Sequence, residues 1–166
     1  MSSDLMKQGM VFVLLLLAQI LVLGRIHLFD FATPLLYVYF IVRMPRNYPK
    51  WALLLWGFVL GLIIDIFGNT PGLAASSLTL VALVQPYYLE LFVPRDSAEN
   101  LQPTMATIGP LKYTYYATGL VLFYCFVFYS LEMFNFFNVL QWVLCALGSA
   151  LLTILLIFTF EIAGKK

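Results

Sequence analysis

The sequence predicts an all-α integral membrane protein: one six-helix transmembrane bundle that takes up the whole chain, residues 1–166. Two observations predict this class. Hydrophobic residues make up 63% of the chain and charged residues only 10%, which is too little polar surface to cover a soluble globule of this size. Apolar runs of about twenty residues, the length that crosses a hydrocarbon core as a helix, account for most of the chain, so we expect no soluble domain.

The expected spans follow one another along the chain. The first, residues 9–24, is nearly all Leu, Val and Ile, with Gln19 as its one polar interior residue. Because MSSDLMK before it has no net charge and no small-residue cleavage pattern follows it, we expect a retained helix rather than a secretory signal. The second, from residue 31 or 34 to residue 43, has only ten to thirteen positions and contains Pro34, so we expect a short or broken span. The other four are expected at residues 51–67, 71–92, 113–131 and 139–163.

Prolines interrupt the second half of the chain. Pro86, which follows Gln85, should kink the fourth span. Residues 93–112 contain three prolines and both signs of charge, so we expect a loop there, with one amphipathic turn around residues 105–111.

The basic residues predict an orientation. If the N-terminus is cytoplasmic and six segments cross, eight of the nine Lys and Arg residues fall on the cytoplasmic side, and only Arg25 lies outside. A re-entrant second segment would instead place most of these charges outside. We therefore expect a multi-pass protein of the bacterial cytoplasmic (inner) membrane with both termini cytoplasmic.

The stretch from Gly57 to Leu80 predicts a membrane hairpin that carries one carboxylate, Asp65. An ionisable group inside a span is costly and needs a reason. Gly57 and Gly61 form a GxxxG pair, and Gly68 and, more loosely, Asp65 fall on the same side of the helix. We therefore expect the carboxylate to face neighbouring helices rather than lipid.

The turn of this hairpin has a pattern of its own. Gly68 suits the residue just past a helix end, Thr70 suits an N-cap, and Pro71 suits the first position of the next helix. Small residues then repeat every three or four positions to give the second helix one smooth face. The expected partner-binding or helix-packing residues are Gly57, Gly61, Asp65, Gly68, Pro71, Gly72, Ala75, Ser76 and Thr79.

Catalytic chemistry has little support in the sequence. His27 is the one histidine; it lies near Arg25 and Asp30, and we favour an interfacial belt over an acid-base set. Cys125 and Cys145 lie in apolar runs, where a thiol behaves as a small hydrophobe. We expect no enzyme activity, no catalytic, cofactor-binding or metal residues, no cofactor and no nucleic-acid partner.

The role of Asp65 stays open between two readings. Asp65 lies about one helical turn from Gly68, so it can reach the interface or pair with Arg25, which is a structural role. Alternatively it binds a partner, within an outward-facing group of polar residues. That group comprises Arg25, His27, Asp30, Asp65, Asn69, Thr70 and Glu132.

Residues 61–83, GLIIDIFGNTPGLAASSLTLVAL, resemble the signature hairpin of the rod shape-determining protein MreD family. In that family a helix ending in G-L-x-x-D-x-x is followed by a short G-x-P-G-type turn and a helix rich in small residues. The resemblance covers about a seventh of the chain. It implies a non-enzymatic component of the cell-elongation (Rod) machinery that maintains cell shape. It also implies partners: an MreC-like protein, the MreB cytoskeleton, directly or indirectly, and the glycosyltransferase and transpeptidase complex that builds lateral peptidoglycan, all within membrane lipid.

A second function remains open. The six-helix fold that the resemblance implies is similar to that of energy-coupling-factor transporter S-components, which bind the substrate in vitamin importers. Chain length and helix count fit such a subunit. S-components usually carry a small-xxx-small pattern on the first helix, whereas bulky residues surround the single Ala18 here, so we favour the first function.

Overall fold

The structure is a computed structural model that describes residues 2–21, 34–134 and 138–164. Every regular element in these ranges is a helix, as the sequence predicts. The helices are α1 (Ser2–Leu21), α2 (Val38–Val42), α3 (Lys50–Gly68), α4 (Leu73–Glu90), α5 (Met105–Ile108), α6 (Pro110–Glu132) and α7 (Val139–Ala163).

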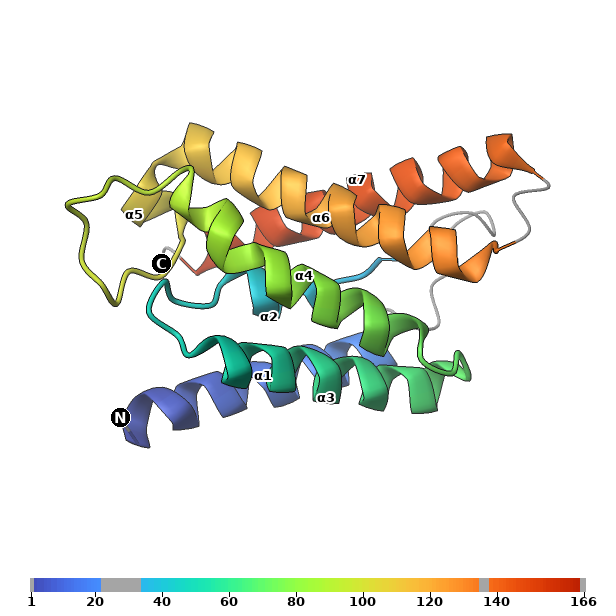
Figure 1. Ribbon diagram of the computed structural model, residues 1–166, viewed down its shortest axis with the longest axis horizontal. Helices are drawn as coiled ribbons and strands as arrows, with labels where there is room; N and C mark the ends of the chain where they lie inside the picture. The colour runs from blue at the N-terminus through green and yellow to red at the C-terminus, as the bar shows by residue number, and fades with distance from the viewer. Residues whose placement is uncertain (1, 22–33, 135–137, 165–166) are drawn as a thin grey trace.

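The long helices run side by side along one axis (Figure 1). Helices α1 and α3 form one side of the bundle, α6 and α7 form the opposite side, and α4 lies between them. Helices α1, α3 and α6 run in one direction, and α4 and α7 run in the other. The start of α1, the end of α7, the connection before α3 and the segment of residues 91–104 therefore lie at the same end, on the left of Figure 1.

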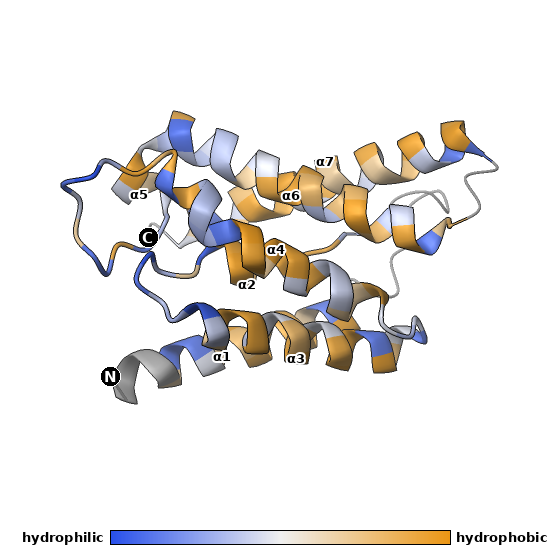
Figure 2. Ribbon diagram, viewed as in Figure 1, coloured by the Kyte–Doolittle hydropathy of each residue, from blue (hydrophilic) through white to orange (hydrophobic). Residues whose placement is uncertain are grey.

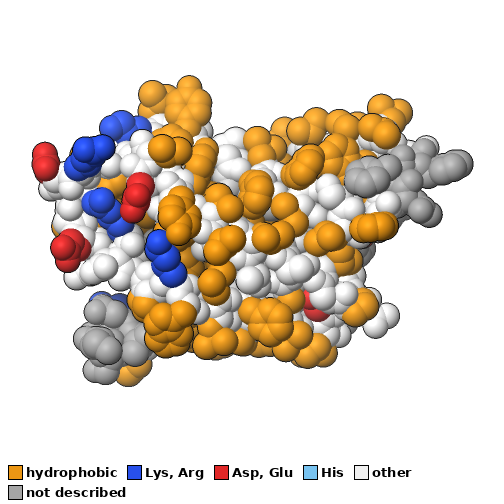
Figure 3. Space-filling view, in the orientation of Figure 1, with side chains coloured by type: hydrophobic (Ala, Val, Ile, Leu, Met, Phe, Trp, Pro, Cys, Tyr) orange, Lys and Arg blue, Asp and Glu red, His pale blue; other side chains and the backbone are white. Residues whose placement is uncertain are grey.

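Three of the described helices are long and apolar enough to cross a membrane: α3, α6 and α7. Helix α1 adds a shorter apolar stretch, Met6–Leu21. Figure 2 shows hydrophobic residues along the helices and hydrophilic ones in the segment of residues 91–104. In Figure 3, hydrophobic side chains are spread over the face shown between the two ends. Since lipid contact accounts for large apolar side chains on an outer surface, the chain is an α-helical membrane protein.

The centre of the bundle holds residues 34–44, which are helical only over the five residues of α2. Their side chains are buried, apart from that of Arg43, and Val38, Ile41 and Val42 have no exposed surface at all. The sequence predicts a short or broken second helix here, and the structure agrees. Non-helical backbone at membrane depth requires partners from protein, because lipid offers no hydrogen bonds.

Polar side chains from the surrounding helices provide those partners at the start of the segment. The carboxamide of Gln19, on α1, donates to the carbonyl of Pro34 (2.9 Å) and accepts from the N–H of Leu36 (3.1 Å). The hydroxyl of Thr153, on α7, accepts from the N–H of Leu35 (3.1 Å).

Helices α4 and α6 provide partners at the end of the segment. The hydroxyl of Tyr116 donates to the carbonyl of Val42 (3.0 Å), and the carboxamide of Gln85 donates to both the Tyr116 hydroxyl (2.9 Å) and the carbonyl of Met44 (3.3 Å). Isolated polar residues in otherwise apolar helices are thus the residues that hold the unwound segment.

Helix boundaries differ from the sequence prediction at several ends. Helix α4 runs from Leu73 to Glu90, against the expected residues 71–92, and Pro86 lies inside it as expected. Helix α6 begins at Pro110, three residues earlier than expected, because proline at the first helical position sacrifices no hydrogen bond. Helix α7 has the predicted bounds. The expected amphipathic turn is α5, whose N-terminus is capped by a capping box between Thr104 and Thr107.

Candidate functional site

The Asp65 carboxylate caps the first turn of α4. One oxygen accepts from the N–H of Ala74 (2.8 Å) and from the hydroxyl of Thr70 (3.0 Å), and the other accepts from the N–H of Ala75 (2.9 Å). The first N–H groups of a helix have no partner inside the helix, and the helix dipole favours negative charge beside them. The side chain is 4% exposed. A carboxylate on α3 therefore fixes where α4 begins.

The turn between α3 and α4 differs from the predicted one. Gly68 is the last residue of α3, and Asn69, with φ 55°, takes the left-handed conformation that was expected of a glycine. The Thr70 hydroxyl donates to Asp65 and does not cap α4, although the Thr70 carbonyl accepts from the N–H of Leu73 (3.4 Å). Thr70 is therefore not the N-cap, and Pro71 lies before the helix rather than in its first position. Gly72, with φ 81°, occupies the N-cap position. The physical reason is that Asp65 already caps α4 from the preceding helix.

Two glycines of α3 let the backbone of α4 approach closely. A Cβ added at Gly61 would lie 2.4 Å from the Cα of Ala75 and 2.6 Å from the carbonyl oxygen of Ala74. A Cβ added at Gly57 would lie 3.2 Å from both the Cβ of Ala82 and the carbonyl oxygen of Leu78, which is tight but not prohibitive. Gly61 and Ala75 are buried against each other's helix. The two glycines of the GxxxG pair therefore contact α4, the other helix of the same hairpin.

The small-residue face of α4 is divided. Ala75 packs against α3, whereas Gly72 and Ser76 are exposed and Thr79 is partly exposed. The hydroxyl of Ser76 donates to the carbonyls of Gly72 (2.5 Å) and Leu73 (3.1 Å), and that of Thr79 donates to the carbonyl of Ala75 (2.6 Å). Their polar groups are satisfied within their own helix. An outward-facing patch of Gly72, Ser76 and Thr79, hereafter the small-residue patch, remains beside the hairpin contact.

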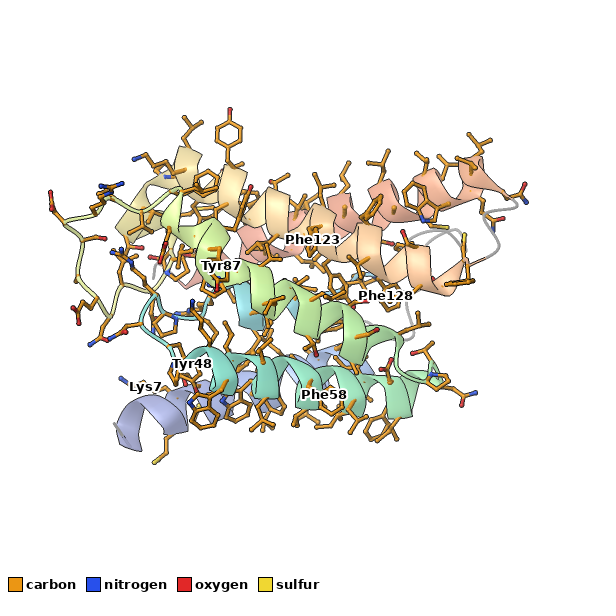
Figure 4. All side chains as sticks on the ribbon, in the orientation of Figure 1. Lys7, Tyr48, Phe58, Tyr87, Phe123 and Phe128 are labelled. Carbon is orange, nitrogen blue, oxygen red and sulfur yellow. The ribbon has the colours of Figure 1, made fainter. Side chains whose placement is uncertain are left out.

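Next to this patch the outer surface of α3 is apolar. Phe58 points away from the bundle in Figure 4. Most of the exposed large apolar side chains of α3 follow a helical spacing, namely Trp51, Leu55, Phe58, Leu62 and Ile66, and Phe67 is exposed beside the last of them.

Of the expected outward-facing polar group, the structure brings Thr70 and Asp65 together through a hydrogen bond (3.0 Å). Asp65 is buried under the start of α4, while Asn69 and Glu132 are exposed. Arg25, His27 and Asp30 lie outside the described residues. Within the described part of the chain, no three His, Cys, Asp or Glu residues are grouped to hold a metal ion.

The sequence analysis missed one buried carboxylate, Glu161 on α7. It accepts from the Tyr39 hydroxyl (2.8 Å) and from the N–H of Met105, the first residue of α5 (3.1 Å). The sequence does contain a signal for this residue, because Glu161 is the one acidic residue in the last predicted span. Both buried carboxylates, Asp65 and Glu161, thus bind backbone N–H groups at the start of a helix.

Comparisons of the chain with family models, with curated proteins and with solved structures found no match. Fold and site together define an all-helical membrane protein. Its distinguishing features are a glycine-packed hairpin locked by a buried carboxylate and an unwound segment at the centre of the bundle.

Proposed function

We propose that this chain is a six-crossing membrane scaffold of the cell-elongation machinery, as the resemblance of residues 61–83 to the MreD family implies. The hairpin geometry supports a packing role for this stretch, because Asp65, Gly61 and Ala75 all serve the contact between α3 and α4. The centre of the bundle is filled by the chain's own residues 34–44, which favours a structural component over a carrier.

The observation that carries the proposal is the small-residue patch. Small side chains let the backbone of a second helix approach closely, and in lipid such approach is a main source of helix association. Gly72 and Ser76 are exposed although the neighbouring Ala74 and Ala75 are buried in the hairpin. The patch is the surface that would receive a transmembrane helix of an MreC-like partner. The cytoskeleton and the peptidoglycan-building enzymes would be reached through that complex.

The orientation of the scaffold follows from its charged end. The Lys and Arg side chains visible in Figure 3 gather at the end of the bundle where α1 begins. Arg46 bonds to Ser97 (3.3 Å), which ties the connection before α3 to the segment of residues 91–104, and Lys50 at the start of α3 bonds to Tyr87 on α4 (3.1 Å). Basic residues favour the cytoplasmic side. We propose six crossings of the cytoplasmic membrane with both termini inside.

Cysteine labelling tests this topology. In a variant with Cys125 and Cys145 replaced, a single cysteine at Asn69 should react with a membrane-impermeant maleimide in intact cells, because Asn69 is exposed at the outer end. A cysteine at Ser97 should react only after the membrane is permeabilised. The reverse pattern would overturn the orientation, and labelling of both sites in intact cells would exclude an arrangement with the two connections on opposite sides.

A leucine in the small-residue patch tests partner binding. Ser76→Leu should weaken co-purification with an MreC-like partner and give rounded cells when it is the sole copy in a rod-shaped host. Its level in the membrane should stay normal, because Ser76 is exposed and bonds only within its own helix.

Thr159→Leu on α7 is the matched control. Its hydroxyl is also exposed and also bonds to a carbonyl four residues earlier, that of Leu155 (2.8 Å). If both variants bind the partner and keep the cell shape, the interface is not the small-residue patch. If depletion of the whole protein leaves shape intact and abolishes uptake of a vitamin, the S-component function replaces the scaffold.

A further inference from the structure

A groove lies at the charged end of the bundle, between α1 and the end of the unwound segment. It has a volume of about 130 Å³, whereas one water molecule occupies roughly 10–15 Å³ of such space. A chemical group of several atoms therefore fits. Its polar lining comes from Lys7, Gln8, Arg43 and Gln102, and its apolar lining includes Val11 and Phe40.

The charge of the groove is positive and uncompensated by its own lining. Lys7 and Arg43 both line it, and none of the described residues that line it is acidic. Arg43 is exposed. Its guanidinium lies 5.9 Å from the centroid of the Tyr39 ring and also bonds to the Tyr39 side chain, whose hydroxyl donates to Glu161. An aromatic ring carries no charge to neutralise a cation. The two cations are thus available to an anion.

An unpaired acceptor beside the groove favours a ligand that carries a hydrogen-bond donor as well as a negative charge. Gln8 lines the groove, and its carboxamide oxygen is buried and has no hydrogen-bond partner among the described residues. A buried acceptor without a donor is unfavourable, so a ligand that brings a hydroxyl or amine donor gains by binding there. Choline offers no such donor, whereas a glycerol headgroup offers hydroxyls.

The surroundings of the groove point to a lipid. Beside Val11 the outer side of α1 carries exposed apolar side chains, namely Met10, Val13, Leu14 and Leu17. A phosphate held by Lys7 and Arg43 would leave acyl chains to lie along this surface. Basic pockets between membrane helices bind anionic headgroups in this way.

We propose that the groove binds an anionic phospholipid whose headgroup carries hydroxyls, of the phosphatidylglycerol class, with its phosphate between Lys7 and Arg43. The site is independent of the proposed scaffold function, because it lies at the opposite end of the bundle from the small-residue patch and requires only that this end meets a membrane surface. The shared chemistry, a phosphate ester with hydroxyls, also occurs in free glycerol phosphate, so the experiment separates the two sources.

The test uses the full chain in a mild detergent with phosphatidylcholine. Short-chain phosphatidylglycerol, short-chain phosphatidylcholine and glycerol phosphate are each titrated, and bound molecules are counted by native mass spectrometry. The wild type should bind phosphatidylglycerol in preference to the other two. The variant Lys7→Gln/Arg43→Gln should bind it roughly 25-fold more weakly, at roughly fivefold for each cation near a lipid surface.

The variant Arg95→Gln/Lys112→Gln is the matched control, since it removes two cations of the same end that do not line the groove. Its affinity for phosphatidylglycerol should equal that of the wild type. Val11→Phe fills the groove without changing any charge, and it should also lose the preference for phosphatidylglycerol. This variant decides the proposal if Lys7→Gln/Arg43→Gln proves less stable than the wild type. No preference in the wild type, an equal loss in the control, or equal binding of glycerol phosphate would each overturn the proposal.

Discussion

Replacing Asp65 with leucine is expected to prevent the bundle from accumulating in the membrane. The substitution removes the acceptor of the Ala74 and Ala75 N–H groups, which are both buried. Each buried donor left without a partner costs about 1–3 kcal/mol, so the two together cost on the order of 2–6 kcal/mol. That is a large fraction of the stability of a domain of this size. Thermal unfolding in detergent and the steady-state level in the membrane measure the effect.

Two further variants separate the contributions to this site. Asp65→Asn keeps one acceptor oxygen and removes the charge, so its loss of stability should lie between those of the wild type and Asp65→Leu. Thr70→Ala removes only the partly exposed hydroxyl that donates to the carboxylate and should cost about 0.5–1.5 kcal/mol. If Asp65→Leu accumulates and unfolds like the wild type, the carboxylate does not stabilise the hairpin. The alternative, that Asp65 binds a partner, would then be favoured.

The sequence predicts the hairpin well because its signals are local. An apolar run, a glycine spacing and a Gly/Pro turn are each readable within a few residues, and they predict that Asp65 faces protein. The turn itself is predicted wrongly at Thr70 and Pro71, because N-cap rules assume that the cap is adjacent to the helix. Here the acceptor comes from nine and ten residues upstream, across the turn.

The contacts of the buried segment, residues 34–44, could not be predicted from local sequence signals. Its shortness and Pro34 predict a broken helix, and Gln19 is visible as a polar residue in an apolar helix. The pairing of that segment with Thr153 joins residues 118 positions apart in the chain, and the pairing of Tyr39 with Glu161 joins residues 122 positions apart. Periodicity carries no information about such contacts, so only the folded chain reveals why each polar side chain is there.

Gly61→Ala is expected to separate α3 from α4, although it adds only one methyl group. The new Cβ would lie 2.4 Å from the Cα of Ala75, and backbone cannot turn away as a side chain can. The helices must therefore move apart, which weakens the contacts of Asp65 with α4 at the same time. Overpacking of a tight core costs about 1–3 kcal/mol, and the loss of cap contacts adds to it. A lower unfolding temperature in detergent, with reduced membrane level, is the expected result.

The other glycines of the chain supply graded controls for this prediction. Gly57→Ala meets both the Cβ of Ala82 and the backbone carbonyl oxygen of Leu78 at 3.2 Å, so a small shift of α4 should accommodate it at less cost than at Gly61. Gly9→Ala meets nothing within 4 Å and should leave stability unchanged or raise it, because alanine is the better helix former by about 1 kcal/mol. The order of stability should therefore be Gly9→Ala, then Gly57→Ala, then Gly61→Ala. A Gly61→Ala protein as stable as Gly9→Ala would mean that α3 and α4 do not approach as closely as their backbones indicate, and that the GxxxG pair is free to serve a partner helix instead.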